Sequence, residues 1–127
     1  MTAITKTTVG LNLLRDGSSG ANVPQITYVA LGTSSTAPTA ADTQLGSEVF
    51  RKKVTASTNG ATGEILINMY LAPGDAIGKD IEEVGFFGGA SATSRANTGV
   101  LIGHGLYSHN PKSNVESIQF QLDQTFS

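Results

Sequence analysis

The sequence has no cysteine and no tryptophan among its 127 residues, and only 14% of the residues are charged. Without cysteine the chain can form neither disulfides nor thiolate metal sites. With three tyrosines, five phenylalanines and no tryptophan, it offers little material for the stacking platform of a carbohydrate-binding module. A net charge of −2 lacks the basic footprint of a nucleic-acid-binding domain. The one basic cluster, Arg51-Lys52-Lys53, should not form a single patch, because in a strand Arg51 and Lys53 face one side and Lys52 the other. The composition therefore predicts no nucleic-acid partner and makes a carbohydrate-binding module the less favoured reading.

Apolar runs are also short. No stretch approaches the ~20 apolar residues that a membrane-spanning helix needs, and residues 1–8 contain no apolar core of a signal peptide. We therefore expect no membrane partner and synthesis in a cytoplasm. A surface with so few charges favours association, because charge is what normally keeps proteins apart. The low charge therefore indicates a protein that functions as part of a larger assembly.

Short β-favouring runs fill the chain from residue 25 to residue 124, separated by turns rich in Gly, Thr, Ser and Ala. The runs predict strands at residues 25–31, 49–58, 64–71, 81–87, 100–107 and 115–124. Asn59-Gly60 is the strongest turn signal and predicts a hairpin. The fold class that follows is mainly β: an antiparallel β-sandwich or small barrel of about six strands with one N-terminal helix.

The N-terminal part carries the helix signal. Apolar residues recur at helical spacing over residues 5–16, with Thr5 as the expected N-cap. Further on, Asp42-Thr43-Gln44-Leu45 predicts one helical turn that places Leu45 on the core. We expect a single domain, residues 1–127, in which residues 1–20 form a helix or arm and residues 25–124 form the β-sandwich.

Residues that could perform chemistry are scarce. His104 and His109 lie in or near one strand without a neighbouring carboxylate in the local sequence, so a surface or cavity-lining role is expected rather than metal binding. Glu82 and Glu83 are adjacent in a strand and should face opposite sides. One of them should meet a polar environment or a cation, with Arg51 and Arg15 as the candidates. No Gly-x-Ser-x-Gly elbow or phosphate-binding loop is present. The chain is predicted to be no enzyme and to carry no cofactor and no metal.

One succession of motifs is distinctive. It runs through Gly10–Asp16, Ile26–Thr33, Thr36–Pro38, Asp42–Leu45, Glu48–Lys52, Ile81–Phe87 and Gly99–Ile102. This order resembles a group of small tailed-bacteriophage virion proteins of the tail-fibre or baseplate-associated type, over roughly residues 8 to 107. The resemblance implies a β-rich structural subunit that is located in the virion and works through oligomeric protein–protein contacts. Its implied partners are itself, as a homo-oligomer such as a trimer, and other virion proteins of the tail or capsid.

The chain lacks the repetitive shaft and C-terminal tip of long fibre proteins, which argues against direct binding to a host receptor. An adaptor or tail-decorating subunit is the expected function, and a capsid decoration (cement) protein is the alternative. We expect the contacts in residues 1–14, 33–41 and 88–98. The candidate contact residues are Ile4, Val9, Leu11, Thr36, Pro38, Ala90, Thr93 and Arg95.

Overall fold

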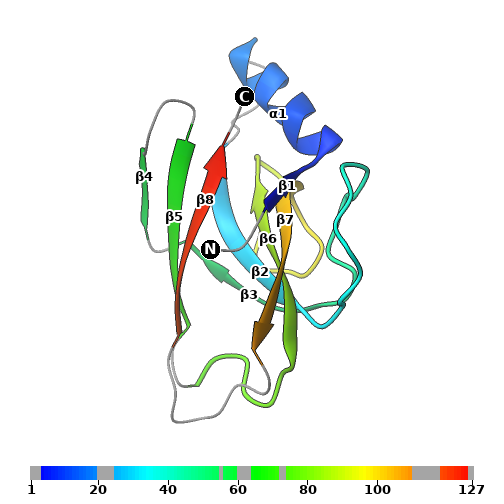
Figure 1. Ribbon diagram of the computed structural model, residues 1–127. Helices are drawn as coiled ribbons and strands as arrows, with labels where there is room; N and C mark the ends of the chain where they lie inside the picture. The colour runs from blue at the N-terminus through cyan, green and yellow to red at the C-terminus, as the bar shows by residue number, and fades with distance from the viewer. Residues whose placement is uncertain are drawn as a thin grey trace.

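The computed structural model describes residues 4–19, 25–54, 56–59, 64–71, 74–109 and 118–125, and within this part of the chain it contains eight strands and one helix (Figure 1). In chain order these are β1 (Ile4–Lys6), α1 (Thr8–Ser18), β2 (Ile26–Gly32), β3 (Glu48–Lys53), β4 (Ala56–Asn59), β5 (Glu64–Leu71), β6 (Ile81–Gly88), β7 (Val100–His109) and β8 (Ile118–Thr125).

The strands form two antiparallel sheets. The larger sheet has the order β1-β7-β6-β2-β3, and the smaller one has the order β4-β5-β8. Helix α1 lies at one end of the molecule, above the sheets in Figure 1. The prediction of a mainly β fold with one N-terminal helix is confirmed. The finer choice between a β-sandwich and a small barrel stays a prediction.

The main core joins the two sheets. Val29 of β2 and Phe86 of β6 are fully buried, and they belong to one apolar cluster with Ile67 and Met69 of β5. Successive side chains of a strand point to opposite faces, so alternate residues of β2 and β6 supply this layer. Burial of such large side chains stabilises the fold by about 1.5–3 kcal/mol each. The larger sheet therefore uses one of its faces to pack on the smaller sheet.

The helix begins later than the sequence predicts. Residues 4–6 pair with β7 as strand β1, so the helix begins at Thr8, and its N-cap is Thr7 rather than Thr5. The Thr7 hydroxyl accepts a hydrogen bond of 3.0 Å from the Gly10 amide, as an N-cap does. The prediction was wrong here because the pairing with β7 is a long-range contact that local periodicity does not register.

The predicted strand at residues 49–58 is divided between the sheets. β3 pairs with β2 in the larger sheet, whereas β4 pairs with β5 in the smaller one. The predicted hairpin is confirmed by the pairing of Asn59 with Ile65, although Gly60 and residues 115–117 of the predicted last strand lie outside the described residues. Together with β1, this division raises the strand number above the expected six.

The second face of the larger sheet is covered by loops. Leu45, which comes from the loop between β2 and β3, packs with Ala30, Phe87 and Leu101 in a separate apolar cluster. The burial predicted for Leu45 is confirmed, but residues 42–45 form bends and irregular backbone rather than a helical turn. Among the described residues, α1 is the one helix, and it falls short of the length and apolar character needed to cross a membrane.

Candidate functional site

Glu83 of β6 is the centre of the most unusual polar cluster. Its side chain is fully buried. The carboxylate accepts hydrogen bonds from the backbone amides of Ser34 (3.1 Å), Gly46 (2.9 Å) and Ser47 (2.8 Å). These amides belong to both ends of the 33–47 loop, whose ends also meet through the Thr33 amide and the Ser47 carbonyl at 3.0 Å. A buried carboxylate thus supplies the acceptors that this loop's backbone would otherwise lack.

His104 of β7 connects Glu83 to the tip of the same loop. Its Nε2 lies 2.9 Å from the Glu83 carboxylate, and its Nδ1 lies 2.9 Å from the Asp42 carboxylate. A carboxylate thus lies within hydrogen-bond distance of each ring nitrogen. In this geometry neither ring nitrogen is available to take a proton from a nucleophile, as a catalytic His must. The ring acts as a bridge between sheet and loop.

The Asp42 carboxylate organises the loop tip. It accepts hydrogen bonds from the Thr39 amide and the Thr39 hydroxyl, both at 2.9 Å, besides facing His104. The Ala40 carbonyl next to it accepts a 2.7 Å hydrogen bond from the Thr8 amide at the start of α1. The 33–47 loop is therefore held at its ends by Glu83 and at its tip by His104 and α1. It has the closed ends of an Ω-loop.

Desolvation raises the pKa of the Asp42 carboxyl, but hydrogen bonds from Thr39 and His104 outweigh this effect and leave the pKa below its ordinary value of 3.8. A carboxyl with a lowered pKa stabilises the fold above about pH 3.8, and this contribution is lost as the pH falls through the lowered value. We therefore expect Asp42→Asn to reduce the free energy of unfolding at neutral pH. The difference from the unmodified protein should shrink toward zero in acid. Urea titrations between about pH 6 and about pH 2 would show this, and a pH-independent difference would contradict it.

Two glycines leave the space that the Glu83 side chain and Leu45 of the 33–47 loop occupy. A Cβ at Gly32 would lie 2.3 Å from a Glu83 carboxylate oxygen, and a Cβ at Gly85 would lie 2.7 Å from Leu45 Cδ2. The glycines flank Glu83, because Gly32 is its register partner on β2 and Gly85 lies two residues along β6. A side chain at either position would push the 33–47 loop away from the sheet.

Gly85→Ala should consequently destabilise the protein by about 1–3 kcal/mol through overpacking against Leu45. Gly74→Ala is the matched control, because a Cβ there meets nothing within 4 Å and should change stability by about 0.5 kcal/mol or less. Denaturant unfolding of both variants measures the difference. Equal stabilities would mean that the loop does not pack on β6 as described.

A small pocket of about 80 Å³ opens beside the His104 ring. Its other lining residues are Ser34, Thr36, Ala37, Asp42, Gln44 and Gly46. Clefts that bind small-molecule ligands usually measure ~300–1,000 Å³. The pocket is thus a recess in the rim of the 33–47 loop rather than a cleft for a metabolite.

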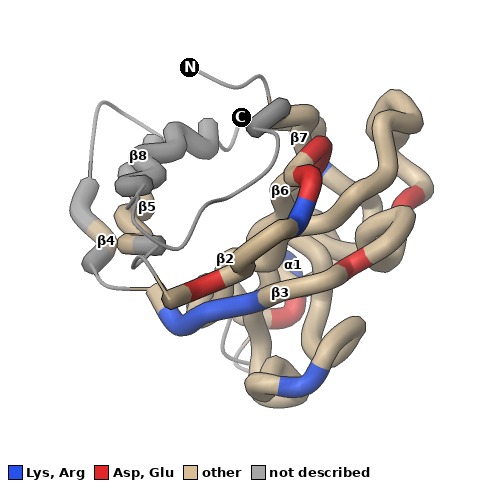
Figure 2. The backbone as a smooth tube through the Cα atoms, turned by 90° about the horizontal axis from the view of Figure 1, so that it is seen from below, with Lys and Arg blue, Asp and Glu red and all other residues tan. Residues whose placement is uncertain are grey.

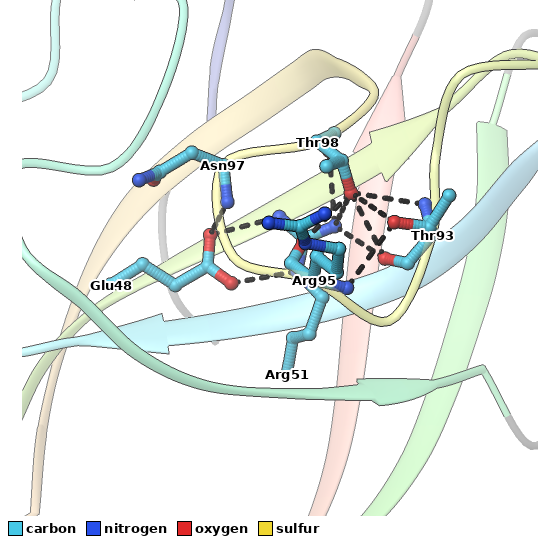
Figure 3. A network of polar contacts seen from close by, with 6 residues as sticks. All are labelled: Glu48, Arg51, Thr93, Arg95, Asn97 and Thr98. Carbon is cyan, nitrogen blue, oxygen red and sulfur yellow. Dashed lines mark hydrogen bonds and ion pairs between the residues drawn. The ribbon is translucent and has the colours of Figure 1, made fainter.

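A buried ion pair holds the loop at residues 89–99, which joins β6 to β7 (Figure 3). The Arg51 guanidinium of β3 donates two hydrogen bonds to the Glu48 carboxylate, at 2.6 and 2.8 Å, and the two side chains are 2% and 1% exposed. Arg51 also donates to the backbone carbonyls of Thr93 (2.9 Å) and Thr98 (3.0 Å). Its guanidinium carbon lies 4.3 Å from the centroid of the Phe87 ring.

Glu48 also contacts the 89–99 loop directly. Its carboxylate accepts a 3.0 Å hydrogen bond from the amide of Asn97, which has a positive φ of 64°. The Thr98 hydroxyl links the Thr93 amide, at 3.0 Å, to the Arg95 carbonyl, at 2.7 Å. The 89–99 loop is therefore closed on itself by Thr98 and bound to β3 by Glu48 and Arg51.

Both loops lie on the same face of the larger sheet. Ala30 pairs with Arg51 on one side and with Gly85 on the other, and Gly85 pairs with His104. Residues paired across antiparallel strands share a face. Arg51 and His104, which hold the two loops, thus belong to the face that does not pack on β4-β5-β8.

The basic run of β3 does not form one patch, although Figure 2 shows it as a continuous blue stretch of the tube. Arg51 points into the 89–99 loop, whereas the Lys52 amine pairs with Asp75 at 2.6 Å and lies 5.9 Å from the centroid of the Tyr70 ring. Alternation along the strand predicted that Arg51 and Lys52 would face opposite sides, and this is confirmed.

The predicted contact residues are placed as follows. Thr36, Ala90, Thr93 and Arg95 are exposed on the two loops, and Leu11 is 48% exposed on α1. Val9 and Pro38 are half-buried, and Ile4 packs against the main core, so much of its surface is used within the chain. The structure thus brings five of the residues to the surface without testing their role. Contacts of residues 1–3 lie outside the described part.

The polar environment expected for one of the two neighbouring carboxylates is found at Glu83, but the two candidate cations are not its partners. Glu83 contacts His104 and loop amides rather than Arg51 or Arg15; Arg51 pairs with Glu48, and Arg15 pairs with Asp16 at 3.0 Å. Of the surface or cavity-lining role expected for His104, the structure shows the second, since the ring lines the small pocket; the side chain of His109 lies outside the described part of the chain. The carboxylates that meet His104 were missed because Asp42 and Glu83 are 62 and 21 residues away in the sequence.

Within the described residues no group of three or more His, Asp or Glu side chains is arranged to hold a metal ion. Comparison of the chain with protein-family models, with curated proteins and with solved structures gives no match.

Proposed function

We propose that this chain is a non-enzymatic structural subunit of a tailed-bacteriophage virion, mounted on the tail as a fibre adaptor or tail-decorating subunit, and that it acts through oligomeric protein–protein contacts. The sequence resemblance supplies the class of particle. The observation that carries the contact role is the pair of loops that buried polar clusters hold on one face of the sheet, with Glu83 under one and Arg51 under the other.

Pre-organised loops suit a contact surface. Binding is weakened by the loss of conformational freedom when a loop becomes ordered, and a loop that is already fixed avoids most of this loss. Each loop is also nearly free of charge: Asp42 is the one charged residue of 33–47, and Arg95 is the one charged residue of 89–99. Interface centres are depleted of charged residues because charges must be desolvated on contact. The exposed Thr, Ser and Ala side chains of these loops can form a contact without that loss.

The polar clusters of the described residues support the same reading. His104 is engaged at both nitrogens and the pocket beside it measures about 80 Å³, so the cluster has the properties of a structural link. A capsid decoration protein could use the same fold and the same contact loops. The two alternatives therefore differ in where the chain is located on the particle.

Electron microscopy of particles with gold-labelled antibodies against this chain tests the proposal. Label on the tail is the expected result. Label confined to the head would replace the tail assignment by the capsid alternative, and particles free of the chain would overturn the virion proposal altogether. A second check is the hydrolysis of small ester or glycoside substrates by the purified chain. Turnover that disappears in His104→Gln would contradict the non-enzymatic function.

A further inference from the structure

The Asp42 carboxylate keeps one open acceptor position at the tip of the 33–47 loop. Its Oδ2 accepts from the Thr39 amide and faces Nδ1 of His104, both at 2.9 Å. Its Oδ1 accepts one hydrogen bond from the described residues, at 2.9 Å from the Thr39 hydroxyl. An ionised carboxylate offers about four acceptor positions, so a position on Oδ1 remains. The side chain is 27% exposed, and a partner from outside the chain can therefore reach it.

The charge of Asp42 has no cation of its own in the described part of the chain. Desolvation raises the pKa of this carboxyl, but hydrogen bonds from Thr39 and His104 leave it below the ordinary value of 3.8, so the group is ionised at neutral pH. The described arginine and lysine ion pairs involve other carboxylates. The His104 ring carries at most one positive charge and is shared with Glu83. The loop tip therefore attracts a further cation.

The recess of about 80 Å³ beside Asp42 provides space and further acceptors. Ser34 and Thr36 line it with hydroxyl groups, and Gln44 lines it with an amide group. Thr36 and Gln44 are both exposed. A cavity of about 10–15 Å³ already holds one water molecule, so the recess can admit the end of one side chain.

We propose that this recess binds the ammonium group of a single lysine side chain from the neighbouring virion protein, with the ammonium against Asp42. The inference rests on the proposed function, because it names the side chain that the 33–47 loop receives when it makes its contact. An ammonium group has three donors, and the carboxylate, hydroxyl and amide oxygens around the recess are acceptors for them.

A lysine fits this recess better than an arginine. A guanidinium binds a carboxylate as a fork, with one hydrogen bond to each oxygen. Oδ2 of Asp42 is already occupied by Thr39 and His104, so half of such a fork would lack its acceptor. A compact ammonium group needs one carboxylate oxygen and can direct its other donors at neighbouring groups.

The pair would fix the position of a contact that otherwise has little charge. Asp42 is the one charged residue of the 33–47 loop. Charge-assisted hydrogen bonds become stronger when the partner covers them and excludes water. Truncation of one member of a covered charge pair lowers affinity by well over tenfold.

Incorporation of tagged variants into particles, in competition with the unmodified chain, tests the inference. We expect Asp42→Asn to be incorporated at least about tenfold less than the unmodified chain, because it removes the charge that meets the lysine. Asp80→Asn is the matched control, since it makes the same change of charge at an exposed position outside both contact loops. Its incorporation should stay within about twofold of the unmodified chain.

A second pair of variants leaves Asp42 and its hydrogen bonds in place. Thr36→Lys puts an ammonium group of the chain itself at the rim of the recess, and Thr36→Gln adds a side chain of similar length without the charge. We expect Thr36→Lys to be incorporated at least about tenfold less than Thr36→Gln. The amides of Ser34 and Gly46 should keep their protection from hydrogen exchange in both free variants, which shows that the loop stays attached.

A water-soluble carbodiimide, which joins a carboxyl group to an amine in contact with it, identifies the partner in intact particles. The expected product is a peptide containing Asp42 joined to a lysine of another chain, and a product joined to a small free amine would overturn the choice of lysine. Equal incorporation within both pairs of variants would overturn the inference and leave the proposed function in place. Particles that lack the unmodified chain would overturn the proposed function and this inference together.

Discussion

Glu83→Ala should reduce the free energy of unfolding by about 3–5 kcal/mol, because it leaves buried donors without an acceptor. The lost partners are the amides of Ser34, Gly46 and Ser47 and the Nε2 of His104. A buried donor left unpaired costs about 1–3 kcal/mol, and structural relaxation of the loop limits the sum. Denaturant unfolding measures the loss directly.

Glu82→Ala is the matched control. Glu82 lies on the same strand, is half-buried and faces the opposite side, so we expect its removal to cost about 1 kcal/mol or less. The loss of stability in Glu83→Gln should lie between those of Glu83→Ala and Glu82→Ala, since glutamine keeps one acceptor oxygen but places an amide N–H₂ group among donors. Equal losses in Glu83→Ala and Glu82→Ala would show that the buried carboxylate does not hold the loop.

Arg51→Ala should also reduce the free energy of unfolding by about 3–5 kcal/mol, but for a different reason. The substitution removes both hydrogen bonds to a Glu48 carboxylate whose side chain is 1% exposed, and it also removes the donors to Thr93 and Thr98. An uncompensated buried charge is what makes the loss of one partner so large. Arg51→Lys should restore only a small part of the stability lost in Arg51→Ala. A lysine ammonium cannot bind the carboxylate and the loop carbonyls together, as the planar arginine guanidinium does.

A double-mutant cycle separates the interaction energy between Glu48 and Arg51 from the other effects of truncating each side chain. Glu48→Ala with Arg51→Ala should lose less stability than the sum of the single variants, since the double variant leaves no buried charge unpaired. Lys53→Ala, at the exposed end of β3, should change stability by about 0.5 kcal/mol or less. Additive single effects in the cycle would contradict the buried ion pair.

The sequence predicts the general fold from local signals. Period-2 alternation and turn residues identify the mainly β class, the β4–β5 hairpin and the opposite directions of Arg51 and Lys52. The start of α1 and the division of residues 49–58 were missed for one shared reason. β1 exists because it pairs with β7, far away in the sequence, and β3 leaves the β4–β5 hairpin to pair with β2 on the other side of the 33–47 loop. Local propensity contains no information about which sheet a strand joins.

The candidate site was predictable only in part. The burial of Leu45 follows from the sequence, which leaves a surface and a cavity-lining position open for His104 and contains no sign of its contacts with Asp42 and Glu83. A useful signal was present in the apolar strand around Glu83, since a charge in such a strand needs a buried partner. Gly32 and Gly85, which make room for it, are recognisable only when the register of β2 and β6 is known.

The most direct test of the contact role is a comparison of amide hydrogen exchange in the free chain and in the chain incorporated into particles. We expect exposed loop residues such as Thr36, Ala90 and Thr93 to become protected on assembly, while Ser18, at the end of α1 and outside the predicted contact regions, changes little. Unchanged exchange in both the 33–47 and the 89–99 loops, with protection gained elsewhere, would contradict the proposal that these loops are the contact surface.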